Sequence, residues 1–416
     1  MTAGGTPPDV RPVGTAGTGD VADPLLDSTS LDARANAFLA ANPVAGLSVA
    51  IVRTDDEPLL WTGHYGVRDV ESGAPVDEDT SFWLGSVSKT VMGVALMIAR
   101  ERGFLDLDDD VRALLDANGG FSIDGPSTRP ITFAQLASHT SGIVDAEAYA
   151  CAYHFIGPDG EPSREILDPD GDPLVDADCP GPIETTLEGF LCSYLEAGGA
   201  LYDADANFAP GEPGEAMRYS NVGAALVGHA IGLAAGRDLA AFAAREIFAP
   251  LGMRRTSWRS TDLDPANVAT PYLDLGDAPF ALPKYELATW PDGGLRSNAA
   301  DLAALLGALM RDRRADGSSA VLLRPESIER MLPADGAGYG LFVSGDCAPF
   351  AGESRRVLGH AGSDPGAFAF LLFDPEADIG VALTANGDDD EVDGAALEAL
   401  LAALFESGRA LGAGSR

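Results

Sequence analysis

A serine stands three residues before a lysine in the segment WLGSVSKTVMG, residues 83–93. Lys89 and Lys284 are the only lysines among 27 basic residues, so the amine at position 89 does not follow the general preference of this chain. A serine hydroxyl is a weak nucleophile and needs a neighbouring base. Removal from water favours the neutral amine of a lysine, which can accept the serine proton, whereas an arginine stays protonated. Ser86 and Lys89 therefore indicate nucleophilic catalysis by serine.

The residues after Ser86 predict the helix that positions this pair. Apolar residues recur at helical spacing between 87 and about 103, namely Val87, Val91, Val94, Ala95 and Ile98, and a second face carries Met92, Leu96 and Ala99. We expect a mostly buried helix in which Lys89 lies one turn after Ser86 on the same face. The alternative is that Ser86 only caps the helix and that Lys89 is an ordinary solvated residue.

Strand patterns lie at both ends of the chain, with helical patterns between them. Residues 46–53 and 59–69 predict an antiparallel hairpin, and the segments GYGLFVSG, RRVLGH, AFAFLLFD and IGVALTANG after residue 290 read as strands. Residues 104–290 show helical patterns and no convincing run of strands. We predict an α/β (α+β) fold, with one antiparallel sheet flanked by terminal helices and an inserted, mostly helical lobe that forms a cleft against it.

The same patterns suggest boundaries. We expect a disordered leader over 1–30 and one catalytic domain over 31–410, with the sheet lobe in 31–85 and 290–410 and the helical lobe in 86–289. Within the helical lobe, 144–205 is rich in Asp, Pro and Gly and resembles an insertion. It holds Cys151, Cys179 and Cys192, whereas Cys347 lies outside it. Two disulfides and buried free thiols are both compatible with these four cysteines, and the pairing stays open.

Composition excludes several classes of partner and cofactor. A net charge of −37 repels phosphate backbones and anionic lipid surfaces, so we expect no nucleic-acid partner and no membrane insertion. No CxxC pair indicates zinc, and we expect no cofactor. The segment DPDGDPLVD, Asp168 to Asp176, is similar to a calcium loop but lacks the glutamate at the twelfth position, so we favour a solvated turn over a metal site.

An ordered set of motifs resembles a known family. FWLGSVSKT, LASHTSGI, YSN (residues 219–221), GGLRSNAADLA and LGHAGSDPG occur in the order of the serine β-lactamase-like superfamily, from about 30 to 410. This superfamily includes class C β-lactamases, Streptomyces-type D-alanyl-D-alanine carboxypeptidases, D-aminopeptidases and β-lactamase-fold esterases. The resemblance implies a two-lobed fold and an extracytoplasmic location, periplasmic or secreted, although no signal peptide is visible in the first 30 residues.

The resemblance also implies roles for individual residues. Ser86 matches the acylated nucleophile and Lys89 its proton acceptor, while Tyr219 matches the phenol that shuttles a proton to the leaving group. Catalytic His360 would line the cleft from a strand edge beside Tyr219. The substrate-binding positions would be Asn221, which contacts a substrate carbonyl, and the strand residues Ala361, Gly362 and Ser363. The N–H groups of Ser86 and Ser363 would form an oxyanion hole.

One departure from the family pattern bears on the substrate. Ala361 stands where many β-lactamases and carboxypeptidases have a hydroxyl residue that helps to hold the substrate carboxylate, and Ser363 would compensate only in part. Arg296 or other local arginines could still attract an anion. We expect a serine hydrolase that forms an acyl-enzyme, and rank a D-amino-acid peptide carboxypeptidase or peptidase level with an esterase. A β-lactamase and a non-catalytic penicillin- or peptidoglycan-binding sensor are the alternatives.

The acidic, arginine-rich composition reflects either adaptation to salt or the codon bias of a GC-rich genome. If it reflects salt, the melting temperature should rise as KCl is added, because counterions screen the repulsion among surface carboxylates. Thermal unfolding followed by circular dichroism from low to molar KCl tests this. A flat response would favour codon bias.

Overall fold

A computed structural model describes residues 28–54, 58–157, 159–164, 179–274, 279–316, 319–334, 338–345 and 357–413. The first 27 residues of the expected leader lie outside these ranges, as do the Asp168–Asp176 segment and Cys347. Expectations for those parts therefore stay predictions.

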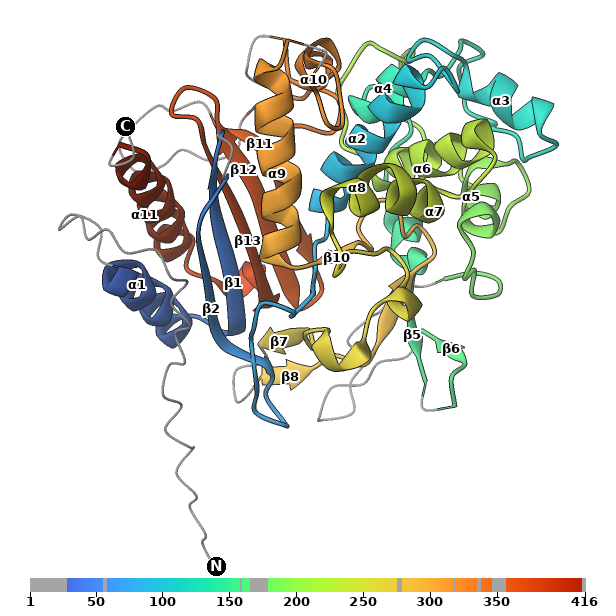
Figure 1. Ribbon diagram of the computed structural model, residues 1–416. Helices are drawn as coiled ribbons and strands as arrows, with labels where there is room; N and C mark the ends of the chain where they lie inside the picture. Colours follow the sequence, from blue (N-terminus) through green and yellow to red (C-terminus); the bar gives the residue numbers. More distant parts are fainter. Residues whose placement is uncertain are drawn as a thin grey trace, which may run out of the picture.

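A six-stranded sheet in the order β11-β12-β13-β1-β2-β3 forms one side of the molecule (Figure 1). Its strands are β1 (Val44–Arg53), β2 (Leu59–Asp69), β3 (Ala74–Pro75), β11 (Leu358–Asp364), β12 (Ala367–Asp374) and β13 (Ile379–Gly387). Every pair is antiparallel, and β1 lies between β2 and β13, so the two ends of the chain meet at the centre. The predicted fold class and the predicted first hairpin are confirmed.

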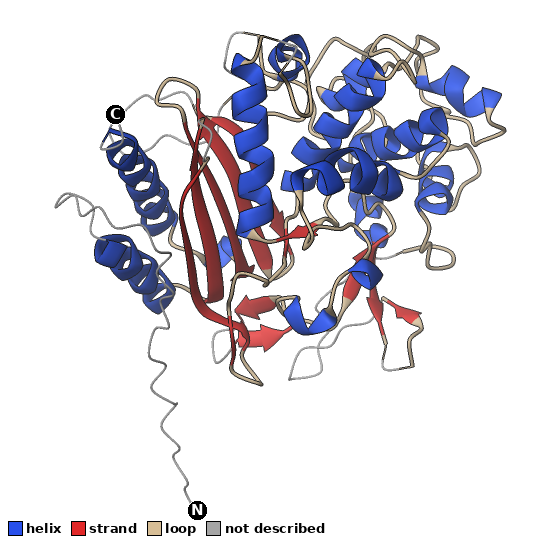
Figure 2. Ribbon diagram, viewed as in Figure 1, coloured by secondary structure: helices blue, strands red, loops and turns tan. Residues whose placement is uncertain are grey.

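Helices cover both faces of the centre of this sheet (Figure 2). The helices α1 (Ser28–Ala41) and α11 (Gly394–Ala413) lie on one face, and α9 (Ala299–Arg314) lies on the other. Successive side chains of a strand point to opposite faces. In β1, Leu47 and Ile51 belong to the apolar cluster under α1 and α11, while Ala50 and Val52 belong to the cluster under α9. Because both faces are covered, β1 is buried along almost its whole length and is mostly apolar instead of alternating.

The middle of the chain is mostly helical, as expected. It contains α2 (Val87–Glu101), α3 (Val111–Ala117), α4 (Phe133–Ala137), α5 (Leu187–Leu195), α6 (Asn221–Ala235), α7 (Leu239–Ala243) and α8 (Ala249–Leu251), and α10 (Pro325–Met331) follows α9. Helix α2 contacts both β11 and α6, and every residue from 87 to 99 is buried. Within the described ranges, no helix is long and apolar enough to cross a bilayer.

Two expectations about strands are wrong. The middle of the chain contains the strands β5 (Tyr153–Ile156), β6 (Pro162–Ser163), β7 (Tyr272–Asp274), β8 (Pro279–Ala281) and β9 (Tyr285–Leu287). They are two to four residues long, too short to produce a period-two pattern. Conversely, GYGLFVSG at 338–345 forms only isolated bridges, and Phe342 has a φ of 55°, which interrupts an extended backbone.

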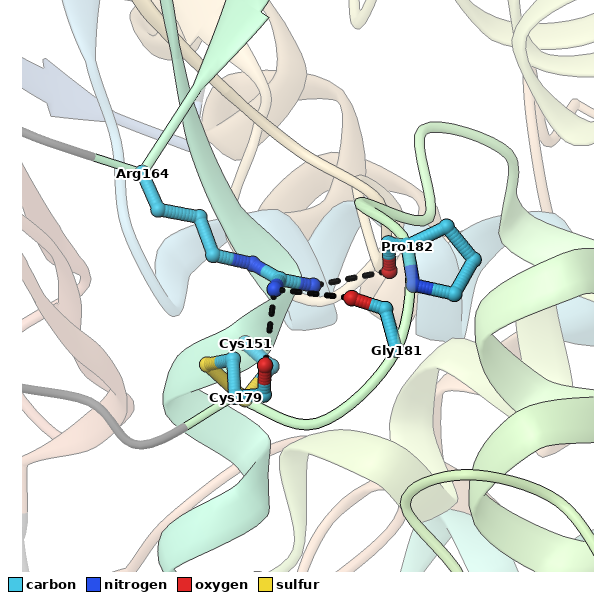
Figure 3. Close-up of a disulfide and its surroundings, with 5 residues drawn as sticks. All are labelled: Cys151, Arg164, Cys179, Gly181 and Pro182. Carbon is cyan, nitrogen blue, oxygen red and sulfur yellow. Dashed lines mark hydrogen bonds between the residues drawn. A yellow bond between two sulfur atoms is a disulfide. The ribbon is translucent and has the colours of Figure 1, made fainter.

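A disulfide joins Cys151 to Cys179 and so anchors the segment that precedes β5 (Figure 3). Cys151 ends the 3₁₀ turn Glu147–Ala152 and is buried. The Arg164 guanidinium holds the other side, because Nη1 donates to Cys179 O at 2.8 Å and Nη2 donates to Pro182 O at 2.8 Å. The open pairing is thereby resolved for two of the four cysteines, and Cys192 is free.

Replacing both bridged cysteines by alanine should lower the free energy of unfolding by about 3 kcal/mol, because the cross-link restricts the unfolded chain over 28 residues. Dithiothreitol should lower the melting temperature of the wild type and leave that of the double variant unchanged. The Cys192→Ala protein, which keeps the bridge, is the matched control and should respond like the wild type. Equal responses of wild type and double variant would refute a stabilising bridge.

Candidate functional site

Ser86 and Lys89 lie at the start of α2 and face each other. Lys89 Nζ donates a hydrogen bond to Ser86 Oγ at 3.0 Å. Ser86 occupies the N-cap position, yet its hydroxyl does not cap the helix. Lys89 is 0% exposed, whereas Ser86 is half-buried and so partly accessible to solvent. The structure therefore excludes the alternative of a capping serine and a solvated lysine.

Three oxygens from three segments surround the Lys89 amine. Besides Ser86 Oγ, Nζ donates to Asn221 Oδ1 at 2.6 Å and to the backbone carbonyl of Asp292 at 2.7 Å. A lysine ammonium carries three N–H donors, so each of them has an acceptor. The ring of Tyr219 adds a cation–π contact, with Nζ 5.1 Å from its centroid. The amine is thus fixed within an otherwise apolar helix.

The start of α6 presents Tyr219 and Asn221 to this amine, and Asp145 holds that helix end. The Asp145 carboxylate accepts hydrogen bonds from the backbone N–H groups of Asn221 at 2.8 Å and Val222 at 3.0 Å. An acidic group at a helix N-terminus satisfies free N–H donors and complements the helix dipole. The side-chain carbonyl of Asn221 accepts from Lys89, and the expected contact between Asn221 and a substrate carbonyl stays a prediction.

His139 supports Tyr219 from behind. Its ring stacks on Tyr219 with centroids 4.3 Å apart, and its Nδ1 accepts a hydrogen bond from the Ser220 N–H at 3.1 Å. Burial, and secondly the charge of Lys89, lowers the pKa of His139 to about 2, so the imidazole is neutral and its Nδ1 can accept. Tyr219 itself remains 37% exposed at the cleft.

Strand β11 lies at the open edge of the sheet and carries the remaining predicted residues. Gly359 exchanges both backbone hydrogen bonds with Ser344 on the side away from β12, at 2.8 and 3.0 Å. Alternate residues of an antiparallel strand direct their backbone groups to the same side, so Ala361 and Ser363 also face this free edge. Both are exposed, whereas His360 and Gly362 are buried.

Two glycines let this edge approach the turn that bears Ser86. A Cβ at position 362 would lie 2.0 Å from Leu84 O and 2.8 Å from Ser86 N. A Cβ at position 85 would lie 2.7 Å from Ser363 N, and Gly85 has a φ of 50°, in the left-handed region that favours glycine. The backbone N–H groups of Ser86 and Ser363 are thereby brought to one place.

His360 is buried instead of lining the cleft surface, with 5% of its area exposed. One ring nitrogen is hydrogen-bonded to the Tyr339 hydroxyl and the other to the Ala361 carbonyl. Burial, assisted by the charge of Lys89, lowers the pKa of His360 to about 3, so the ring is neutral. The Ser363 hydroxyl donates to the Asp389 carboxylate and so is already engaged.

Arg296 is enclosed by other side chains. Its guanidinium stacks 3.7 Å above the Trp83 ring and forms an ion pair with Glu286 at 3.0 Å, with 3% of the side chain exposed. Trp83 belongs to β4 (Phe82–Trp83), which pairs with β10 (Arg296–Ser297), so this arginine is part of the wall behind the site. Among the described residues, no three His, Cys, Asp or Glu side chains are grouped to hold a metal ion.

Two buried carboxyl groups near the site were not predicted. Tyr149 donates to Asp292 Oδ2 at 3.1 Å, and Tyr153 donates to Asp364 Oδ1 at 2.9 Å. Burial raises the pKa of each carboxyl to about 7. The chain has 64 acidic residues, so nothing in composition singles these out. The only signal for them in the sequence is their position. Asp292 directly precedes the motif GGLRSNAADLA, and Asp364 directly follows Ser363 in the motif LGHAGSDPG.

Comparisons with known proteins show what the chain as a whole is similar to. Esterase EstB of Burkholderia gladioli is 31% identical over 253 residues, covering 60% of this chain and 56% of the esterase, so the match spans little more than half of that relative. Penicillin-binding protein 4* of Bacillus subtilis (strain 168) is 24% identical over 373 residues, covering 85% and 72% of the two chains. The octameric penicillin-binding protein homologue of Pyrococcus abyssi superposes with a TM-score of 0.68 and 26% identity, covering 92% and 78%.

The family model named Beta-lactamase matches residues 31–404, which include the α2, α6 and β11 segments described above. These relatives comprise an esterase and penicillin-binding proteins on one fold, so the fold does not by itself choose among their activities. The chain belongs to the beta-lactamase family.

Proposed function

We propose that the protein is a serine hydrolase that cleaves an ester or amide through an acyl-enzyme on Ser86. The observation that carries this proposal is the fully buried Lys89 amine, which lies 3.0 Å from the hydroxyl of the half-buried Ser86. A lysine amine in its neutral form can act as a general base, which an arginine cannot. A structural lysine would have no need of an accessible serine as its partner.

The contacts of Lys89 allow it to take the serine proton without rearrangement. A neutral amine has two N–H donors and one lone pair. The two N–H groups can remain on Asn221 Oδ1 and the Asp292 carbonyl, which leaves the lone pair for the Ser86 hydroxyl. When Ser86 Oγ bonds to the acyl carbon, its proton passes to Nζ. Tyr219, whose ring contacts Lys89, then carries a proton to the leaving group.

The oxyanion of the tetrahedral intermediate would be held by the backbone N–H groups of Ser86 and Ser363. Both groups adjoin the close contact between Gly85 and Gly362, and Ser363 faces the free edge of β11. Preorganised donors of this kind stabilise the transition state because they need no reorientation when the charge develops. Ala361 and Gly362 would contact the substrate through their backbone.

The charges at β11 favour an acyl group without a carboxylate. His360 is neutral, Ala361 has no hydroxyl, and the Ser363 hydroxyl is bound to the Asp389 carboxylate. None of these three residues offers a positive charge, and Asp389 would repel an anion. We therefore place an esterase or a peptidase of uncharged substrates ahead of a β-lactamase. The match to an esterase supports the same order.

The variants Ser86→Ala and Lys89→Arg should each lose at least about 10³-fold in turnover, because one removes the nucleophile and the other keeps a proton that cannot be released. The measurements are fluorophosphonate labelling and hydrolysis of p-nitrophenyl esters, nitrocefin and D-alanyl peptides. Lys284→Arg, at an exposed position, is the matched control and should keep full activity. Substantial activity in Lys89→Arg would refute the proton-acceptor role.

The same panel separates the remaining alternatives. Ester turnover without peptide cleavage identifies an esterase, and cleavage of D-alanyl peptides identifies a peptidase. Rapid nitrocefin hydrolysis would overturn the order given above. Labelling of Ser86 without turnover of any substrate would identify a penicillin- or peptidoglycan-binding sensor.

Gly362→Ala tests the oxyanion hole. Its Cβ would meet Leu84 O and Ser86 N, and should force β11 away from the nucleophile turn. We expect a loss of about 10²-fold or more in kcat, the range found when an oxyanion donor is removed. Gly394→Ala is the control, because a Cβ there meets nothing within 4 Å. An active Gly362→Ala protein with an unchanged melting temperature would contradict the assignment.

A further inference from the structure

Two buried carboxyl groups lie directly behind the catalytic residues, and each is joined to a buried tyrosine. Asp292 is 1% exposed and accepts from Tyr149, and Asp364 is 6% exposed and accepts from Tyr153. The rings of Tyr149 and Tyr153 meet edge to face with centroids 6.2 Å apart. One oxygen of each carboxyl lacks a hydrogen-bond partner among the described residues. Buried acids of this kind are costly unless they interact with a charge.

Asp292 has such a charge in Lys89. Its backbone carbonyl accepts from Nζ at 2.7 Å, and the charge of Lys89 acts on its carboxyl through space without a direct ion pair. Among the groups that oppose the rise of its pKa, the charge of Lys89 has the largest effect. For Asp364 the hydrogen bond from Tyr153 has the largest opposing effect, and Lys89 acts more weakly. Asp292 is therefore the acid that is electrostatically coupled to the lysine.

Resting on the proposed function, we infer that Asp292 is a positioning residue that raises the basicity of Lys89. During acylation the O–H bond of Ser86 breaks, a bond forms between Oγ and the acyl carbon, and the proton passes to Nζ. The Asp292 carboxylate keeps its own protonation state and stabilises the ammonium that forms. Without it, that charge would develop in a site of low polarity with only uncharged acceptors.

Other titratable groups also face this pair. From the segment between α4 and the 3₁₀ turn Glu147–Ala152 come His139, which is neutral, and Asp145, whose charge acts on Asp292. Tyr219 comes from the turn before α6. His360 and Asp364 come from β11, and Tyr149 and Tyr153 come from the segment around β5. Asp145 is committed to the N–H groups of α6, and both histidines are neutral. Asp292 is thus the group whose removal should change Lys89 most.

The test is the rate of Ser86 labelling by a fluorophosphonate as a function of pH, in the wild type and in Asp292→Asn. Loss of the carboxylate should lower the alkaline plateau by about 10-fold or more, because the ammonium is stabilised less. It should also move the midpoint of the acid limb to lower pH by about one unit or more, because the amine then binds its proton less tightly. A purely structural role would lower the plateau and leave the midpoint in place, which would overturn the inference.

Asp364→Asn is the matched control, because it removes the other tyrosine-bonded carboxyl. The midpoint of its acid limb should move much less than that of Asp292→Asn. An equal movement would mean that any buried carboxyl near the site has this effect, and would contradict a specific role of Asp292. Tyr149→Phe removes the hydrogen bond to Asp292 but keeps the carboxylate, so it should retain most of the alkaline plateau of the labelling rate. If the wild type itself is not labelled at Ser86, the proposed function fails. If it is labelled and the midpoint does not move, only this inference fails.

A second measurement is made on the wild type, so it does not depend on whether Asp292→Asn folds. Because the chain has only two lysines, selective ¹³C labelling of lysine gives two side-chain sets in an NMR spectrum, from Lys89 and Lys284. The signal of Lys89 in the wild type should show an inflection near pH 7, where Asp292 titrates, and Asp364→Asn should retain it. A Lys89 signal without that inflection would overturn the coupling.

Discussion

Burial of one ammonium group is the constraint on which the site depends. Removing a charge from water costs several kcal/mol unless it is paired or fully hydrogen-bonded. Lys89 meets this requirement with Ser86 Oγ, Asn221 Oδ1 and the Asp292 carbonyl, which belong to α2, to α6 and to the loop before β10. Withdrawal of any one oxygen would leave a buried donor unsatisfied, at a cost of about 1–3 kcal/mol. The site can therefore exist only when these three segments are packed together.

Two positions without a side chain, Gly85 and Gly362, are as important to the site as its reactive side chains. Gly85 and Gly362 let the backbone of β11 touch the turn that bears the nucleophile, with distances that no Cβ could occupy. Strand β11 is at the sheet edge, so the N–H of Ser363 is not used in pairing with β12. An edge strand usually carries a risk of aggregation, because its backbone groups are unpaired. In this fold the exposed residues Ala361 and Ser363 lie on that edge, beside the turn that bears Ser86.

Local charges, and not the overall charge of −37, determine what the cleft attracts. Burial beside Lys89 leaves His139 and His360 neutral, and Arg296 is committed to Glu286 and Trp83. A basic residue in the sequence therefore does not always present a positive charge to a substrate, because it can be neutral or already paired in the folded protein. Of the basic side chains discussed for this site, only Lys89 can bring a positive charge to the described catalytic residues, and its hydrogen-bond acceptors are all protein atoms.

The sequence by itself determined the sheet built from both chain ends, the buried helix α2 and the pairing of Ser86 with Lys89, because periodicity and short spacing report local burial and local geometry. It could not determine that Asp145 holds the start of α6, that Asp292 lies against Lys89, or that Arg296 is enclosed. These contacts join segments far apart along the chain, and an acidic or basic residue has the same local pattern whether it ends in solvent or in the core. Only tertiary packing decides which charges lose their water, and hence which of them serve the chemistry.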